Sequence, residues 1–253
     1  VAASTRQIST QLTAQPSDED KAEIPHRLYA ALHPNAVCSA GSWREMVEPV
    51  IHEVLTNGQT PIICGGTGLY IKALMDGLSP MPDIPDDVRD AVVVRYEEIG
   101  AQNFYDDLMR RDPEMATRFH VNHKARIIRA MEVLEATGRS LADWQREERL
   151  APPKEWQFEI HKVLPERETL YDRCNRRFQW MLDHGALNEV EHFDNRIKSG
   201  EVGQGVPITK ALGFKQIRSY LNGEITLDDA IAAAQTITRR YAKRQVTWFN
   251  NQL

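Results

Sequence analysis

A glycine-rich stretch, "IICGGTGLYIKAL" from Ile62 to Leu74, constrains the fold of this chain more than any other feature. Glycines and a threonine separate a short apolar run from the start of a helical pattern. Such a turn exposes backbone N–H groups and the positive end of a helix dipole, which suits a phosphate or a ligand close to the backbone. In the alternative interpretation, the glycines only supply positive φ in a tight strand-to-helix turn. Spacing alone leaves both interpretations open.

The segments around this stretch predict an α/β fold. Residues 42–58 place apolar side chains at helical spacing, with Ser42 able to cap the start and Asn57 to end the helix. "TPIIC", residues 60–64, predicts a short buried strand, and a helical pattern resumes at 69–77. This order of helix, strand, loop and helix is typical of an α/β sheet.

A proline-rich stretch, "GLSPMPDIPDD", ends this pattern, and the segments after it are helical with no strand between them. We therefore predict a core over 1–82, an all-helical insertion over 83–145 and a return to the core over 146–253. Alternating apolar residues at 156–163 predict a further strand of that core. Further helices are predicted at 167–185, 187–199, 209–221 and 226–248.

Composition places the chain among soluble globular proteins. It has 253 residues, 42% of them hydrophobic and 26% charged. No apolar run is long enough to span a membrane and no signal peptide is evident, so we expect a cytoplasmic protein. The cysteines are scattered, and only His120 and His123 form a close histidine pair, so we predict neither a disulfide framework nor a metal site. A net charge of −5 argues against a nucleic-acid partner unless basic residues cluster locally.

Basic residues do cluster, in three places. Arg126 and Arg129 share one helical face and can grip a polyphosphate, or they are ordinary surface arginines, one of them paired with Glu132. "TRRYAKRQVTWF" and "KALGFKQIR" bring basic residues together near the C-terminus, which suits RNA phosphates, although charge runs are more often solvated faces. The sequence contains no GxxxxGK[ST], HExxH or serine nucleophile elbow.

The blocks "STRQ", "TAQPS", "PHRLY", "SAGSW", "GGTGLYIKAL", "GLSPMP", "RIIRAMEVLEATGRSL", "KALGFKQI" and "YAKRQVTWF" follow one another along nearly the whole chain. Together they resemble the tRNA dimethylallyltransferase (tRNA isopentenyltransferase, IPP transferase) family. The resemblance implies transfer of a dimethylallyl group from dimethylallyl diphosphate to the N6 amine of the adenine adjacent to the anticodon. It also implies a P-loop NTPase-like parallel-sheet core, a helical insertion that holds the anticodon stem-loop, and Mg²⁺.

The resemblance also assigns residues. Thr67 lies where the prenyl donor and the target base meet, with Gly65, Gly66 and Gly68 letting RNA and diphosphate approach the backbone. Arg126 and Arg129 fall in the family's arginine motif, which stabilises the leaving diphosphate and holds RNA. Further substrate-contact positions are Thr5, Arg6, Gln7, Arg89, Lys210, Gly213, Phe214, Lys215, Arg239, Arg240, Lys243 and Arg244. We expect Thr67, Arg126 and Arg129 to face one cavity.

The sequence departs from the family in several places. It lacks the P-loop GPTASGK[ST], in which the main Mg²⁺ ligands are expected. We therefore predict that this polypeptide binds diphosphate poorly. The expected cause of the missing P-loop is trimming or an unrecorded N-terminus. Ser4 stands at the position of the family aspartate that accepts the amine proton, and serine is a far weaker base. The spacing from Gln7 to Thr13 is short, which suggests missing residues. His123 and Ala125 replace the family's usual acid and glutamine.

Rival interpretations are a P-loop kinase of a nucleotide or small metabolite, and a form that only binds RNA because the P-loop and the acid are missing. An adenylate isopentenyltransferase shares the chemistry but does not need the RNA-contact blocks. We expect a monomer that acts on tRNA.

Overall fold

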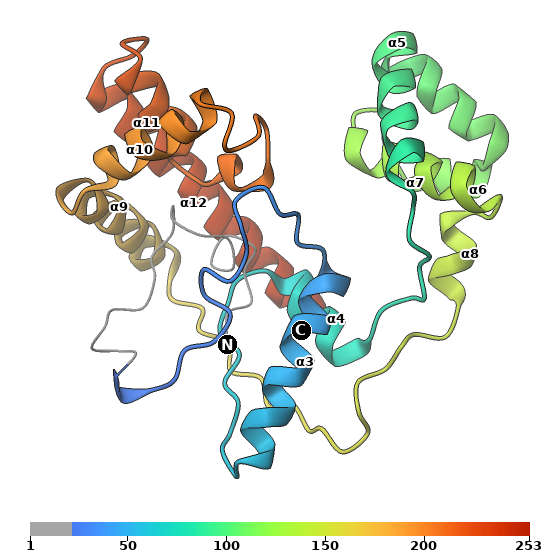
Figure 1. Ribbon diagram of the computed structural model, residues 1–253, viewed down its shortest axis with the longest axis horizontal. Helices are drawn as coiled ribbons and strands as arrows, with labels where there is room; N and C mark the ends of the chain where they lie inside the picture. The colour runs from blue at the N-terminus through green and yellow to red at the C-terminus, as the bar shows by residue number, and fades with distance from the viewer. Residues whose placement is uncertain (1–21) are drawn as a thin grey trace. The chain divides into compact units, whose positions relative to one another are not determined.

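The computed structural model describes residues 22–253, which divide into two compact units (Figure 1). One unit combines the chain before Leu74 with Gln157–Leu253, and the other is Leu74–Trp156. The predictions made for Ser4, Thr5, Arg6 and Gln7, and for the spacing up to Thr13, lie outside the described residues.

In the first unit, helix α3, Ala40–Thr56, starts with a capping box: Ser39 is the N-cap and Ser42 is the third helical residue. Ser42 was predicted as the cap itself, but its hydroxyl instead accepts a hydrogen bond from the backbone N–H of Ser39. Helix α4, Gly68–Asp76, contacts α3 and the residue before its N-cap through the side chain of Tyr70. The Tyr70 ring stacks on Trp43 at 5.2 Å, and its hydroxyl donates to the Cys38 carbonyl oxygen at 2.7 Å.

The rest of this unit is a cluster of C-terminal helices. They are α9 (Arg167–Asp183), α10 (Ala186–Lys198), the 3₁₀ helix η1 (Pro207–Lys210), α11 (Phe214–Leu221) and α12 (Leu227–Gln252). Helix α12 packs against α9 and α11 around a core of aromatic and aliphatic side chains that includes Phe178, Phe193 and Phe214. Gly213, with φ of 94°, leads into α11, and a Cβ there would lie 2.6 Å from the Phe178 ring.

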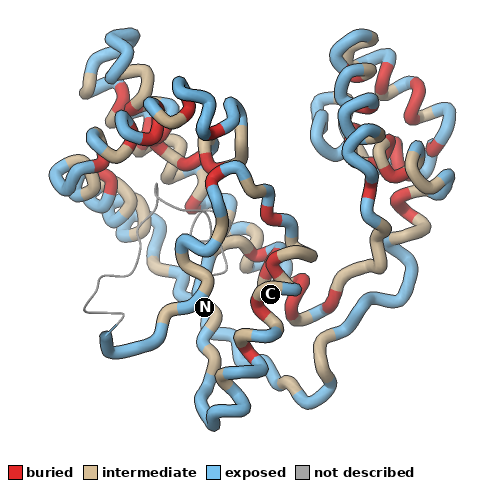
Figure 2. The backbone as a smooth tube through the Cα atoms, viewed as in Figure 1, coloured by how far each residue is buried: buried red, intermediate tan, exposed pale blue. Residues whose placement is uncertain are grey.

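Among its described residues, the second unit contains the end of α4 and four further helices: α5 (Asp86–Arg111), α6 (Pro113–Ala116), α7 (Lys124–Thr137) and α8 (Leu141–Arg146). Gly100, with φ of 79°, bends α5, so that Arg95 before the bend pairs with the buried Asp107 after it at 2.7 Å. Phe104, Leu108, Ile127 and Met131 belong to its buried core. Figure 2 shows buried stretches of these helices in red. The bounds 83–145 predicted for the insertion stay a prediction.

The predicted parallel sheet is wrong, because no strand occurs within residues 22–253 (Figure 1). Residues 60–64 and 156–163, both predicted as strands, are irregular apart from an isolated bridge position at Cys64. Ile62 and Val163 are 66% and 84% exposed rather than buried in a sheet. Apolar patterning favours an extended backbone, but a strand also needs a continuous ladder with a neighbour, which local sequence does not encode. The described chain is therefore a helical fold with irregular connections, not a P-loop NTPase-like α/β core.

Candidate functional site

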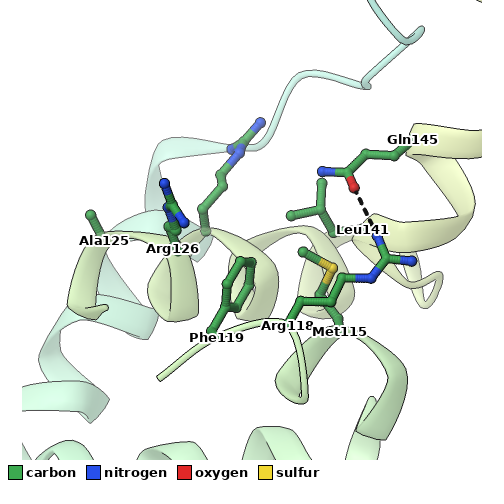
Figure 3. Close-up of a pocket in the computed structure, with 8 residues that line it drawn as sticks. Met115, Arg118, Phe119, Ala125, Arg126, Leu141 and Gln145 are labelled. Atoms are coloured by element: carbon green, nitrogen blue, oxygen red, sulfur yellow. Dashed lines mark hydrogen bonds between the residues drawn. The ribbon is translucent and has the colours of Figure 1, made fainter. Parts of the chain in front are cut away.

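A hollow of about 490 Å³ opens in the second unit, between α7, α8 and the segment that joins α6 to α7 (Figure 3). Its lining is Met115, Arg118, Phe119, Ala125, Arg126, Arg129, Leu141 and Gln145. The hollow thus combines apolar side chains with guanidinium groups. It brings together the two arginines that the sequence singled out.

The two arginines differ in their contacts. Arg129 donates to the Glu132 carboxylate at 3.0 Å, as the ion-pair alternative predicted, and Glu132 is largely buried with 12% of its side chain exposed. Arg126 is exposed, and its guanidinium has no hydrogen-bond or ion-pair partner within residues 22–253. Arg126 therefore has its donors available for an anion.

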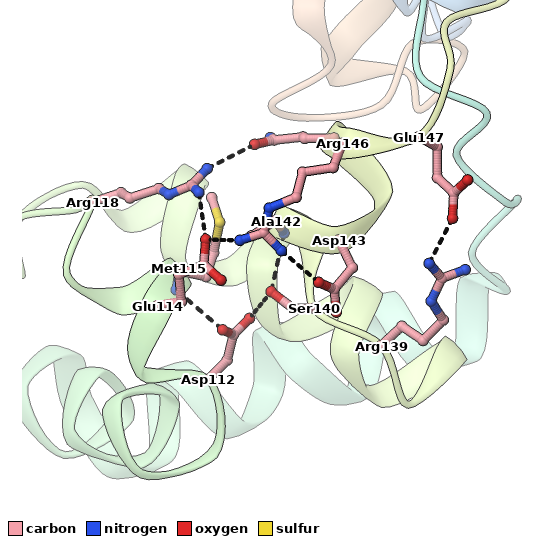
Figure 4. Close-up of polar contacts among 11 residues, drawn as sticks. Asp112, Glu114, Met115, Arg118, Arg139, Ser140, Ala142, Asp143, Arg146 and Glu147 are labelled. Atoms are coloured by element: carbon pink, nitrogen blue, oxygen red, sulfur yellow. Dashed lines mark hydrogen bonds and ion pairs between the residues drawn. The ribbon is translucent and has the colours of Figure 1, made fainter.

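The third arginine of the hollow, Arg118, is held in place. It donates to the Gln145 side-chain oxygen at 3.3 Å and to the Glu114 carboxylate at 2.6 Å (Figure 4). Arg146 pairs with the same Glu114 carboxylate and with Asp143 at 2.7 Å. The Arg146 guanidinium, together with Arg118, keeps the pKa of Glu114 below its usual value, so the carboxylate stays charged.

A buried carboxylate fixes the helices that form the walls of the hollow. Asp112, 5% exposed, accepts from the Met115 backbone N–H at 3.1 Å and from the Ser140 hydroxyl at 2.6 Å (Figure 4). Ser140 in turn caps α8 by accepting from the Ala142 N–H at 3.0 Å. One side chain therefore connects the starts of α6 and α8.

The glycine-rich turn lies in the other unit, at the start of α4. The Thr67 carbonyl oxygen accepts from the backbone N–H of Tyr70 at 2.9 Å, which begins the helix. The Thr67 hydroxyl has no hydrogen-bond partner in the described part of the chain, so it does not cap the helix. Gly66 and Gly68 are not among the glycines with positive φ, which argues against the conformational interpretation of this turn.

The basic C-terminal residues fall into two groups. Arg239 is occupied, because it donates to the Asn175 side-chain oxygen at 2.7 Å and to Thr236 at 2.9 Å. The exposed basic residues are Arg240, Lys243 and Arg244 on α12, Lys215 on α11 and Lys210 at the end of η1; of these, Lys210 also has an interaction partner within the protein. Gly213 and Phe214 lie in the helical core, and their contact with RNA stays a prediction.

The remaining predicted residue, Arg89, is exposed in the first turn of α5 and pairs with Asp86 at 3.5 Å. Thr67 belongs to one unit, whereas Arg89, Arg126 and Arg129 belong to the other. The single cavity expected for Thr67 and the two arginines of α7 therefore stays a prediction.

No group of three histidine, cysteine, aspartate or glutamate side chains within 22–253 could hold a metal ion. Mg²⁺, whose main ligands the family resemblance places in the P-loop, stays a prediction. None of the helices described is long and apolar enough to cross a membrane.

A family model described as IPP transferase matches residues 9–252. The chain belongs to the IPP transferase family. The tRNA dimethylallyltransferase of Paramagnetospirillum magneticum is 45% identical over 243 residues, which cover 96% of this chain and 75% of that protein. The tRNA dimethylallyltransferase of a Bradyrhizobium strain, ORS 278, is 44% identical, with 96% and 77% covered. The family predicted from the sequence blocks is therefore confirmed.

Two solved structures are also similar to this chain. A tRNA isopentenylpyrophosphate transferase from Staphylococcus epidermidis has a TM-score of 0.64 at 29% identity, covering all of this chain and 81% of that one. A eukaryotic dimethylallyltransferase acting on tRNA has a TM-score of 0.80 at 22% identity, covering 98% and 62%. The latter likeness supports the fold alone.

Sequence reasoning missed several residues of this chain that border the predicted positions. Arg118, Phe119 and Gln145 line the hollow, but an irregular turn separates the first two from α7, so helical periodicity gives no signal for them. Gln245, which donates to the Gly66 carbonyl oxygen at 2.8 Å, lies far along the sequence from the turn. Its place inside the block "YAKRQVTWF" was the only available signal.

Proposed function

We propose that this chain transfers a dimethylallyl group from dimethylallyl diphosphate to the N6 amine of the adenine adjacent to the anticodon in tRNA. In this reaction the allylic carbon–oxygen bond to the diphosphate breaks and a carbon–nitrogen bond to N6 forms. The diphosphate leaves with the bonding electron pair, and one N6 proton passes to a base. The proposed state is a monomer, and the proposed RNA partner is the anticodon stem-loop.

The observation that carries this proposal is the 45% identity, across 96% of the chain, to a protein named tRNA dimethylallyltransferase. Identity that extends over nearly the whole chain covers both compact units. A small-molecule kinase has no use for the exposed basic residues of α11 and α12, which suit RNA phosphates.

Each group of site residues is assigned a role by its chemistry. Arg126, exposed and without a partner among residues 22–253, suits a phosphate oxygen of the RNA or of the leaving diphosphate, because a guanidinium donates two hydrogen bonds in parallel. Arg129, already paired with Glu132, contributes positive charge beside it. The Thr67 hydroxyl is proposed to contact the reacting groups.

The outer face of α12 is proposed to contact the RNA backbone. Arg240, Lys243 and Arg244 are exposed there, and Arg244 lies 5.6 Å from the centre of the Tyr241 ring. Such contacts fix the orientation of the RNA and carry little sequence information. Selection of one adenine then depends on extracting that base from its stack.

The test is a transfer assay with the full-length protein, dimethylallyl diphosphate and an anticodon stem-loop RNA, read by mass spectrometry of the RNA. The expected product carries one added dimethylallyl group on the target adenosine, and a stem-loop with guanosine at that position stays unmodified. RNA binding without any transfer would support the binding-only alternative, and transfer of a phosphoryl group from ATP to a small acceptor, with release of ADP, would support a kinase.

A further inference from the structure

The C-terminal half of α12 packs directly on the glycine-rich turn. The Gln245 side-chain amide donates to the Gly66 carbonyl oxygen at 2.8 Å. One turn further along the same helix, Trp248 lies against Gly68. The turn that carries Thr67 is therefore in contact with a helix that begins some 160 residues later in the sequence, as the bounds of α12 show.

These contacts explain why the turn lacks side chains. A Cβ on Gly66 would lie 2.0 Å from the Gln245 amide nitrogen, and a Cβ on Gly68 would lie 2.1 Å from two carbons of the Trp248 ring. Real Cβ atoms do not approach other heavy atoms so closely. Because neither glycine has positive φ, the space taken by α12 accounts for them better than backbone conformation does.

We infer that Gln245 is a positioning residue for the transfer reaction: its amide fixes the Gly66–Thr67 peptide so that the Thr67 hydroxyl stays free at the start of α4. This inference rests on the proposed function and on the role proposed for Thr67. Gln245 itself does not need to touch substrate.

The backbone on both sides of Thr67 is then held. The carbonyl oxygen of Thr67 accepts from the Tyr70 N–H of α4, and the preceding carbonyl, of Gly66, accepts from Gln245. Glycine has the widest backbone freedom of any residue, so a Gly-Gly-Thr-Gly turn without this second hydrogen bond samples other orientations of the peptide. Small errors in the position of a reacting group lower the rate strongly.

The first test compares Gln245 and Gln252, two glutamines of α12 whose side chains form hydrogen bonds with α4 or with the turn before it. Gln245→Ala removes the hydrogen bond to Gly66, and Gln245→Glu keeps the size but replaces the donor by a carboxylate that repels the carbonyl. Gln252→Ala is the matched control, because it removes the 2.9 Å bond from Lys72 at the end of the same helix. We expect both Gln245 variants to lower kcat at least about tenfold with unchanged affinity for the stem-loop, and the control to keep kcat.

The second test asks what the bare backbone of Gly66 is for. Gly66→Ala places a methyl group where the Gln245 amide lies, so it should lower kcat to about the level of Gln245→Ala. In the double variant, Gln245→Ala frees that space, and we expect kcat no lower than in Gln245→Ala alone. If substrate rather than α12 needs the bare backbone, the double variant falls well below either single variant, which would overturn the inference.

Hydrogen exchange of the peptide that spans residues 63–70 supplies a readout without activity. Gln245→Ala should speed exchange in this peptide severalfold, whereas Gln252→Ala should not. If Gln245→Ala leaves the exchange rate of this peptide unchanged, the positioning role is refuted. It is also refuted if the unaltered protein is active and Gln245→Ala keeps its full kcat. Neither result contradicts the proposed function. An unaltered full-length protein that transfers no dimethylallyl group refutes the proposed function instead.

Discussion

Replacing Arg126 by alanine should weaken RNA binding without weakening the fold. Arg126 is exposed and has no internal partner within residues 22–253, so its loss breaks no intramolecular bond, and the free energy of unfolding should stay within about 0.5 kcal/mol. A hydrogen bond to a charged group is worth up to about 3 kcal/mol when buried. At an exposed position about 1 kcal/mol is realistic, which is roughly a fivefold rise in Kd.

The salt dependence gives a second, independent magnitude. Each phosphate contact contributes about 0.7 to 0.9 to the slope of log K against log salt. When the salt concentration rises fourfold, a variant that lacks one phosphate contact should therefore lose about threefold less affinity than the unaltered protein loses. Filter binding of the anticodon stem-loop at several salt concentrations measures both quantities.

Arg110→Ala is the matched control for this measurement. Arg110 is in the same unit, its side chain is 77% exposed, and it does not line the hollow. Asp107, the partner of Arg110, also forms an ion pair with Arg95 at 2.7 Å. Arg110→Ala therefore removes one positive charge, as Arg126→Ala does, without leaving the buried Asp107 carboxylate unpaired. Equal loss of affinity in both variants, or an unchanged salt slope in Arg126→Ala, contradicts the assignment of a phosphate to Arg126.

Three further predictions concern stability. Gly68→Ala forces its Cβ against the Trp248 ring and should cost about 1–3 kcal/mol by urea denaturation, whereas Leu69→Ala, at an adjacent exposed position, should change little. Phe193→Ala empties a fully buried site in the C-terminal helical core and should cost about 3–5 kcal/mol; a loss below about 1 kcal/mol would mean that this core is loosely packed. Burial raises the pKa of the Glu189 carboxyl, so the folded state binds this proton more tightly than the unfolded chain does, and stability falls as the pH rises through the raised pKa. Glu189→Gln should therefore be more stable than the unaltered protein at neutral pH, and the difference should vanish in acid. A stability difference that does not depend on pH would refute this.

The helices could be predicted from the sequence because their signals are local. The predicted stop at Asn57 is the C-cap of α3, and the predicted helices of 167–185 and 226–248 correspond to α9 and α12. Caps and apolar spacing act within a few residues of the backbone that they shape, so one sequence suffices to find them.

The sheet was predicted wrongly and the surroundings of the site were not predicted, because both depend on contacts between distant parts of the chain. Residues 60–64 have the composition of a buried strand, but strand formation depends on a neighbour that composition does not reveal. Likewise, the resemblance pointed to Thr67 and Arg126 but not to what surrounds them. Gln245 bonds to Gly66, next to Thr67, and Arg118 lines the same hollow as Arg126, and both arrangements depend on tertiary structure.

The length of α12 has a consequence for how this chain tolerates insertions and deletions. Its first half is anchored by Ala234, which is fully buried among the C-terminal helices, and its second half presents Gln245 and Trp248 to the Thr67 turn. One residue added between these points rotates everything beyond it by about 100° around the helix axis, so both side chains miss the turn. A whole heptad nearly restores the angle but shifts them about 10 Å along the axis. No insertion keeps both the direction of these side chains around the helix axis and their position along it. Natural variation in length should therefore be confined to the loops that flank α12.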